Sequence, residues 1–367
     1  MKQLVCSIFI LLIMSGCWDQ NRIKDLELVD VVGLDTVGKS NLTKMNLAIS
    51  SLNEAHQGGG KPGMELITAQ GGSVGDAIEN IDYRTAGGLS FNQSRLYILS
   101  KSFAAKEPTE DMEIFGRVAS CPLTSSVVVY DGEVTDLLAM KKKEGKTIAN
   151  YLVVLLRHAE SLHNTPKETL LRFIVGKADP YGDLALPLIK MNGDNIQLSG
   201  AALFREGKYS GIDLSPNLTK LSMLLKGENG TGVSLIIESG GDTYELWVKK
   251  ASKDLHVKSS DNKVNDIILP LHIQAVLTDA GKNNKAKALS QSKIDDLERM
   301  LSEEINKQAL QAIKTLQKAN CDYLELAREI HAFHYKEWKQ MNWREDYPEM
   351  NIRPEVKLQI LNSGVML

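Results

Sequence analysis

The sequence has no surplus of either charge: 43 Lys and Arg residues stand against 46 Asp and Glu residues, for a net charge of −3. A chain without a basic surplus or an acidic tail is not expected to bind nucleic acid. Disorder is also excluded, because 43% hydrophobic and 24% charged residues are ordinary globular proportions. The 367 residues allow two or three domains of ordinary size.

The sequence has little that indicates catalysis or metal binding. No H-E-x-x-H and no C-x-x-C spacing is present. In "GGSVGDA" (71–77), we expect a structural turn in which Ser73 caps a helix, and not a phosphate-binding turn. His331 and His334 are three residues apart on a predicted helix, where packing among aromatic residues is favoured over metal binding. The residues therefore predict no catalytic, cofactor-binding or metal site, and no enzyme.

Cysteine is scarce, with four residues in the whole chain. Cys6 lies inside an apolar N-terminal run and Cys17 follows it, whereas Cys121 and Cys321 lie far from it and from each other. The sequence leaves open whether Cys121 and Cys321 form a disulfide, and two buried free thiols are favoured.

The N-terminal run has the order of a bacterial export signal. Lys2 supplies a positive start, and residues 4–14 form an apolar stretch of signal-peptide length, too short to span a bilayer. Ser15 and Gly16 precede Cys17 as in a lipobox, although Met14 stands where leucine is usual. The pattern predicts that residues 1–16 are removed as a signal peptide and that Cys17 carries a lipid. The alternative is a plain secretory signal in which Cys17 is incidental.

No other stretch of 18 or more apolar residues follows, so we expect a soluble, exported body tethered at Cys17. Strand and helix patterns alternate at first, which predicts a mixed α/β N-terminal domain over residues 17–190. A hairpin signal at 195–215 and a short helix predict a small middle domain over 191–228. Four strands, two helices and a last strand predict a C-terminal α+β domain over 229–367, an antiparallel sheet covered by helices at about 292–316 and 322–341. The predicted fold class is α+β, with three mixed α/β domains.

Two tryptophan residues, Trp338 and Trp343, lie in the last part of the chain. Trp338 continues the apolar face of its predicted helix and is expected in the core. For Trp343, core and interface positions both remain open.

The stretch "GCWDQNRIKDLELVDVVGLD" (16–35) resembles the N-terminus of the spore germination lipoproteins, the C subunits of germinant receptors (Ger(x)C family). The likeness rests on Cys17 followed by Trp18 and Asp19, and on the strand that ends in Gly33-x-Asp35. Arg22-Ile23 departs slightly from the usual Glu-Ile or Glu-Leu. Residues 89–104 and 322–364 are similar to further segments of the family, so the resemblance spans nearly the whole chain.

The resemblance implies a non-enzymatic subunit of three mixed α/β domains. It implies a place on the outer face of the spore inner membrane, beside two integral membrane subunits (A-type and B-type), in a complex that responds to nutrient germinants. Cys17 is the position to which the family's role transfers. Two other classes compete with this hypothesis. A solute-binding lipoprotein of a transport system would have two similar lobes around a cleft, and an exported hydrolase would need a nucleophile or metal spacing.

Overall fold

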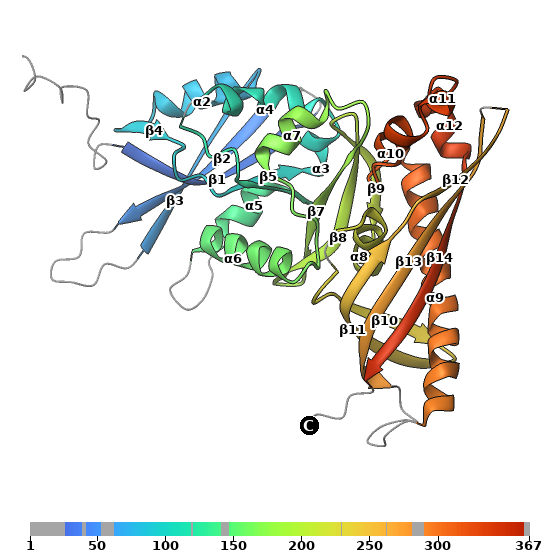
Figure 1. Ribbon diagram of the computed structural model, residues 1–367. Coiled ribbons are helices and arrows are strands. Elements are labelled where there is room, and N and C mark those ends of the chain that lie inside the picture. The colour runs from blue at the N-terminus through green and yellow to red at the C-terminus, as the bar shows by residue number, and fades with distance from the viewer. Residues whose placement is uncertain are drawn as a thin grey trace, which may run out of the picture.

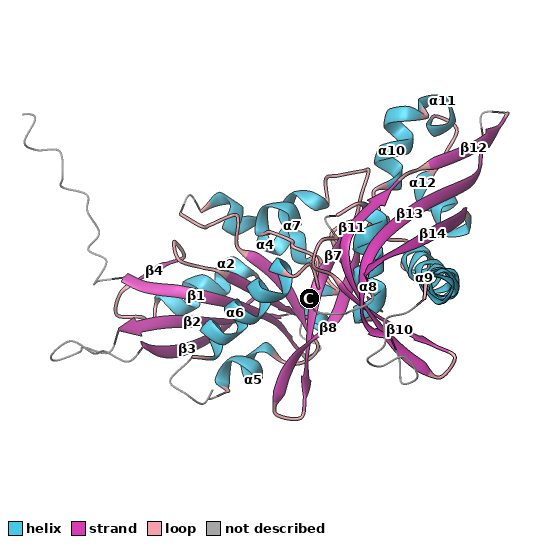
Figure 2. Ribbon diagram, turned by 60° about the horizontal axis from the view of Figure 1, so that its bottom comes forward, coloured by secondary structure: helices cyan, strands magenta, loops and turns pink. Residues whose placement is uncertain are grey.

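The computed structural model of the chain describes residues 26–38, 42–52, 62–118, 120–140, 147–228, 230–261, 263–280 and 290–362. The predicted signal peptide (1–16) and Cys17, Trp18 and Asp19 lie outside the described residues. Within them the chain forms a nine-stranded mixed sheet followed by a five-stranded sheet (Figure 1). Helices pack against both sheets (Figure 2). This arrangement confirms the predicted α+β class with a mostly antiparallel sheet in the C-terminal part.

The strands of the first sheet are β1 (Leu26–Val37), β2 (Leu42–Leu52), β3 (Pro62–Gly71), β4 (Gly88–Ser90), β5 (Leu96–Ser100), β6 (Ser126–Tyr130), β7 (Leu184–Asn192), β8 (Asn195–Arg205) and β9 (Lys208–Leu214). Their order is β3-β2-β1-β5-β6-β7-β8-β9, and β4 pairs with the start of β1. The middle strands β1, β5, β6 and β7 are parallel, whereas the flanking pairs are antiparallel. The sheet is therefore mixed, with a parallel centre.

Helices cover both faces of this sheet, as parallel strands require. One face carries α2 (Val74–Asp82), α3 (Lys101–Ala104), α4 (Pro108–Arg117) and α7 (Leu170–Gly176), and the other carries α5 (Val134–Ala139) and α6 (Ile148–Ser161). β5 shows the two-sided burial. Leu96 and Ile98 join the core under α5 and α6, whereas Tyr97 and Leu99 join the opposite core. All four side chains are at most 1% exposed, which explains why this strand is an almost continuous apolar run.

Gly33 and Asp35 near the end of β1 hold α5 against the sheet. A Cβ atom on Gly33 would lie 2.4 Å from Val134 Cγ1, so only glycine allows α5 to approach this closely. Asp35 is fully buried and accepts hydrogen bonds from the main-chain N–H of Val134 (3.0 Å) and of Thr135 (3.3 Å). The N-cap residue of α5 gives no side-chain bond, so Asp35 supplies the missing acceptor from a distant strand.

The second sheet contains β10 (Ser234–Ser239), β11 (Asp242–Lys253), β12 (His256–Ser260), β13 (Lys263–Ala280) and β14 (Asn351–Asn362). The first four pair antiparallel in the order β10-β11-β13-β12, so that β11 and β12 both pair with β13, and β14 returns parallel to β13. Its apolar face is covered by α8 (Pro216–Lys226) and α9 (Gln291–Lys318). α10 (Leu326–Phe333), α11 (Tyr335–Trp338), α12 (Trp343–Asp346) and the 3-10 helix η3 (Tyr347–Glu349) follow. No helix in the described ranges is long and apolar enough to cross a membrane.

The predicted helix over 322–341 is wrong in its extent, because the chain forms two short helices there. α10 ends at Phe333 and α11 begins at Tyr335, with His334 between them at φ −130° and ψ 48°. These backbone angles are not helical, so the helix breaks although the apolar spacing continues through it. The break leaves Phe333 81% exposed.

The segment predicted as a middle domain contributes to both sheets. β8 and β9 extend the first sheet beyond β7, whereas α8 packs into the core of the second. Figure 1 shows this segment between the two halves of the molecule. The described residues of 191–228 have no core of their own, and the division into three domains stays a prediction.

Candidate functional site

A buried ion pair joins the two halves of the molecule. Asp183, directly before β7, accepts hydrogen bonds from Arg344 Nη1 at 2.6 Å and Nη2 at 3.0 Å. The same carboxylate accepts the main-chain N–H of Asp322 at 2.8 Å and of Glu206 at 2.9 Å. The Asp183 side chain is 1% exposed. A bidentate guanidinium–carboxylate pair fixes orientation as well as distance, so this contact sets how α12 lies against the first sheet.

Asp322 is a second buried carboxylate beside this pair. It accepts hydrogen bonds from the N–H groups of Leu326 (3.0 Å) and Ala327 (2.8 Å), the first residues of α10. Glu325, the formal N-cap, has left-handed backbone angles and gives no capping bond. Burial raises the pKa of the Asp322 carboxyl to about 7, against the opposite effect of these two hydrogen bonds. Asp322 thus caps α10 while its own main chain is bound to Asp183.

Glu168 lies in a third buried position, two residues before the start of α7. Glu168 is 2% exposed, and its Oε2 atom lies 3.3 Å from Arg172 Nε. Burial raises the pKa of Glu168 to about 7, although Arg172 and Lys226 both favour the charged form. The cost of removing a carboxylate from water here exceeds the attraction of two cations.

Lys226 at the end of α8 brings the second half of the chain to this cluster. Its Nζ lies 3.3 Å from Glu325 Oε1 and 4.2 Å from the centre of the Tyr323 ring. The Tyr323 hydroxyl donates to Glu228 Oε1 at 2.8 Å. We call the eight residues that meet here the junction cluster: Glu168, Arg172, Asp183, Lys226, Asp322, Tyr323, Glu325 and Arg344.

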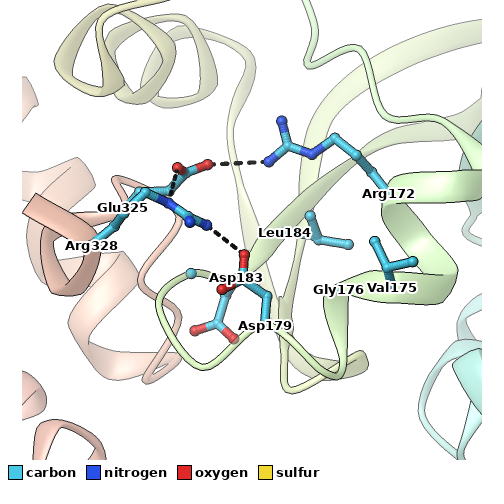
Figure 3. A pocket seen from close by; sticks show the side chains of 9 residues that line it. Arg172, Val175, Gly176, Asp179, Asp183, Leu184, Glu325 and Arg328 are labelled. Atoms are coloured by element: carbon cyan, nitrogen blue, oxygen red, sulfur yellow. Dashed lines mark hydrogen bonds and ion pairs between the residues drawn. The ribbon is translucent and has the colours of Figure 1, made fainter.

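A pocket of about 280 Å³ opens beside the junction cluster, and Figure 3 shows the charged side chains that line it. Arg172 donates to Glu325 at 3.1 Å, and Arg328 pairs with both Glu325 and Asp179. Arg172 and Asp179 belong to the first half, Glu325 and Arg328 to the second. Each charge that lines the pocket is thus paired across or beside the junction, and the arrangement acts as a clamp between the halves.

The raised pKa of Glu168 predicts a pH dependence of stability. An unfolded glutamate loses its proton near its ordinary pKa of 4.5, whereas folded Glu168 keeps it up to about 7. Between these two pH values, the folded chain holds a proton on Glu168 that the unfolded chain has lost. The free energy of unfolding therefore falls as pH rises from about 4.5 to 7, by about 3 kcal/mol for this group. Glu168→Gln stays neutral, so its urea midpoint should fall less than that of the wild type between about pH 5 and pH 7.5.

The exposed Glu303 on α9 supplies the matched control. Glu303→Gln should keep the wild-type slope. An unchanged slope in Glu168→Gln would show that burial does not govern the protonation of this carboxyl.

Aromatic side chains form a column along the same junction. His331 stacks on Tyr181 with ring centres 4.5 Å apart and meets Trp338 at 5.6 Å. Trp343 continues the column between Trp338 (5.9 Å) and Tyr347 (5.2 Å). Trp343 is 6% exposed, so it belongs to the core, whereas Trp338 is partly buried and packs against it. The predicted packing role of His331 among aromatic residues is confirmed.

The two distant cysteines are both buried and free, as the sequence favoured. Burial raises the pKa of the Cys121 and Cys321 thiols, which disfavours the reactive thiolate. Across the described ranges, no three or more His, Cys, Asp and Glu side chains are grouped to hold a metal.

Three glycine-rich stretches match nucleotide or nucleophile patterns by spacing alone. Residues 33–40 fit the P-loop pattern, but β1 continues into a turn and the antiparallel strand β2, where a P-loop needs a helix. Residues 71–75 fit G-x-S-x-G, yet Ser73 has φ −141° and its side chain accepts from Asp76 N–H as the N-cap of α2. The third, 58–63, lies largely outside the described residues. The two described matches therefore lack the structure that their chemistry requires.

The junction cluster was missed by sequence reasoning. Charged residues in a helical pattern usually lie on a solvated face, and Asp183 and Arg344 are 161 positions apart. One signal was available, because Asp322 and Arg344 both lie in the 322–364 segment that carries the family resemblance.

Two family models match consecutive parts of the chain. The spore germination protein N-terminal domain matches residues 19–191, and the spore germination B3/GerAC-like C-terminal domain matches residues 199–364. The chain therefore belongs to the GerAC-like family of spore germination proteins, as the resemblance predicted.

Particular relatives can be named within this family. The spore germination protein GerQC of Bacillus cereus is 25% identical over 367 residues, which cover 100% of this chain and 99% of that protein. The spore germination protein A3 of Bacillus subtilis (strain 168) is 23% identical over 265 residues, 71% of this chain and 70% of that one. The crystal structure of the GerBC protein matches with a TM-score of 0.60 at 15% identity, over 90% of this chain and 97% of that chain. This last likeness supports the fold.

Proposed function

We propose that the protein is a lipid-anchored, non-enzymatic subunit of a spore germinant receptor. Membership of the spore germination family over residues 19–191 and 199–364 is the observation that carries the proposal. In this proposal, Cys17 holds the lipid at the outer face of the spore inner membrane. The body works beside two integral membrane subunits, A-type and B-type, in the response to nutrients.

A non-catalytic role suits what the described residues offer. The charged side chains at the junction pair with one another, and Ser73 is engaged as a helix cap. A nucleophile needs a base within hydrogen-bond reach, and Ser73 has only a main-chain donor as its described partner. The clamp at the junction would instead let the two halves move as one body, which fits a subunit that transmits a signal between partners.

A solute-binding lipoprotein is less well supported by the fold. Such a protein would need two similar lobes, whereas the first half here is a mixed sheet covered on both faces and the second a mostly antiparallel sheet covered by α8 and α9. The pocket of about 280 Å³ beside the junction cluster is small and its charges are already paired. A second pocket between the halves is larger, about 730 Å³, and is lined mainly by charged and polar side chains of the β8–β9 hairpin and by the end of α9.

Recovery of the native protein from detergent-solubilised spore membranes tests the proposal. We expect it to be recovered with two polytopic membrane proteins, identified by mass spectrometry of the purified material. Recovery alone, or with the membrane subunits of a transporter, would overturn the receptor proposal.

A further inference from the structure

Sheet edges carry unpaired main-chain groups that invite other strands, and proteins usually cover or shorten them. In the second sheet, helix side chains bind the main-chain groups of two edge strands, β14 and β10. On β14, the N–H groups of Val356, Leu358 and Ile360 donate to side chains of α9 at 3.1, 2.9 and 2.7 Å. The acceptors are Asn306, Ser302 and Glu298. Four helix residues rise about 6 Å and two strand residues about 6.6 Å, so the two repeats match.

The edge of β10 is covered in the same way by α8. Asn217 bonds both the carbonyl and the N–H of Ile236, and Lys220 Nζ donates to the carbonyl of Ser234 at 2.7 Å. The amide of Asn217 thus takes the place of a neighbouring strand.

Three other edge strands are protected by length and shape. β4 has three residues, and β12 has five, with exposed Lys258 and a bulge after it. β9 has seven residues, pairs through a bulge and contains Gly211 at φ +82°. Short, bulged and lysine-bearing edges resist the addition of another strand.

β3 is long and has neither a bulge nor a lysine, although its first residue, Pro62, has no main-chain N–H. It has ten residues, pairs with β2 in unbroken register and contains one charged residue, Glu65. Within the described residues, its backbone receives one bond from outside β2, from Asn80 Nδ2 to the carbonyl of Gln70 at 2.9 Å. Figure 2 shows β3 at the margin of the first sheet, beyond β2.

The hydrophobic cores on the two faces of the first sheet are not fully covered at the edge formed by β3. Met64 and Leu66 on one face and Ile67 on the other are only partly buried. On β2, the paired residues Leu47 and Ala48 are fully buried. One more strand beside β3 would bury its apolar side chains on both faces as β3 buries those of β2.

The charges around β3 indicate which kind of strand would pair there. Glu65 is exposed, and α2, which lies beside β3, exposes Asp76, Glu79 and Asp82. A second copy of the chain paired through β3 would bring these like charges together, whereas a segment with a basic side chain opposite Glu65 would be attracted.

We propose that the outer edge of β3 binds an extended segment of a partner receptor subunit by strand addition, with a basic side chain opposite Glu65. Main-chain hydrogen bonds supply the affinity in this mode, and alternate side chains supply the specificity. The inference rests on the proposed function, because it requires a receptor partner.

Cross-linking from two matched positions tests the inference in the full-length protein. Glu65 on β3 and Glu238 on the covered strand β10 are both exposed glutamates on edge strands. Glu65→Cys and Glu238→Cys are labelled with a benzophenone maleimide in spore membranes and irradiated. Cys121 and Cys321 are buried, and the unsubstituted protein gives the background. We expect Glu65→Cys to form a product with another polypeptide, in at least about tenfold higher yield than Glu238→Cys.

A charge reversal supplies a second measurement. Glu65→Lys on the exposed side of β3 should keep the fold and lower partner recovery by about tenfold, the effect of exchanging one cross-strand attraction for a repulsion. Glu238→Lys should leave recovery unchanged.

A Glu65→Cys product with both peptides from this chain overturns the inference. So does the lack of a product in membranes from which the partner still co-purifies, a result that leaves the receptor proposal intact. If no partner co-purifies with the unsubstituted protein, the receptor proposal itself fails.

Discussion

Replacing Asp183 by alanine is expected to lower the free energy of unfolding by about 3–5 kcal/mol, the cost of leaving a buried charge without its partner. The substitution removes the bidentate acceptor of Arg344 and the acceptor of two main-chain N–H groups at once. Water cannot replace the carboxylate at low cost, because Asp183 is 1% exposed at its side chain. Urea unfolding of the purified body, followed by circular dichroism, measures the change.

Two further variants separate the buried pair from charge effects in general. Asp296→Ala removes the exposed partner of Arg299 on α9, whose side chains are 73% and 74% exposed, and it should change stability little. The double variant Asp183→Ala, Arg344→Met should be less destabilised than Asp183→Ala alone, since it removes the guanidinium that has lost its bidentate acceptor. Equal effects of Asp183→Ala and Asp296→Ala would contradict the role given to the junction.

Local patterns predicted the strands and the long helix well. The alternating pattern at 94–100 and the β-branched run at 125–131 correspond to β5 and β6. β5 is buried on both faces, and such strands have few polar positions. The helix predicted at about 292–316 corresponds to α9, which extends from Gln291 to Lys318. Period and composition are local properties, so a single sequence contains them.

Long-range pairing could not be predicted from the same patterns. The hairpin predicted at 195–215 was placed in a small middle domain, and the structure shows that its first strand, β8, pairs with β7 of the first sheet. The break at His334 has no proline or glycine to mark it. His331 before the break and Trp338 beyond it both contact the ring of Tyr181, which belongs to the first half of the chain. In each case, the contact that determines the local structure joins residues too far apart in the sequence to appear in a local hydrophobic period.

For the family motif at the N-terminus, the motif residues were predicted from the sequence, whereas the residues that contact them were not. Gly33 and Asp35 were expected from resemblance, and the structure gives their physical reason, the close approach and capping of α5. The residues that hold α5 from the other side, Asn46 and Thr135, were not expected. Asn46 Nδ2 donates to Asp35 at 3.0 Å and Thr135 Oγ1 to Asn46 at 2.8 Å, and neither contact leaves a local pattern.

Replacing Cys17 by alanine should release the protein from the spore membrane and impair the nutrient response. A lipoprotein cysteine carries several acyl chains, and two or more chains hold a protein firmly where one holds it only marginally. The described body should stay folded in the variant, because residues of the described ranges build the cores of both sheets.

Cys6→Ala is the matched control, because it removes a cysteine from the segment that is predicted to be cut away. It should leave both membrane association and germination unchanged. A failure of this control would mean that the apolar run, and not the lipid on Cys17, holds the protein in place.

The most direct test of a tethered receptor subunit compares wild-type and Cys17→Ala spores in one experiment. Immunoblots of the membrane and soluble fractions locate the protein, and the fall in optical density after nutrient addition measures germination. The expected result is a soluble variant in spores that respond slowly or not at all. A variant that remains in the membrane fraction, in spores that germinate normally, would contradict the account.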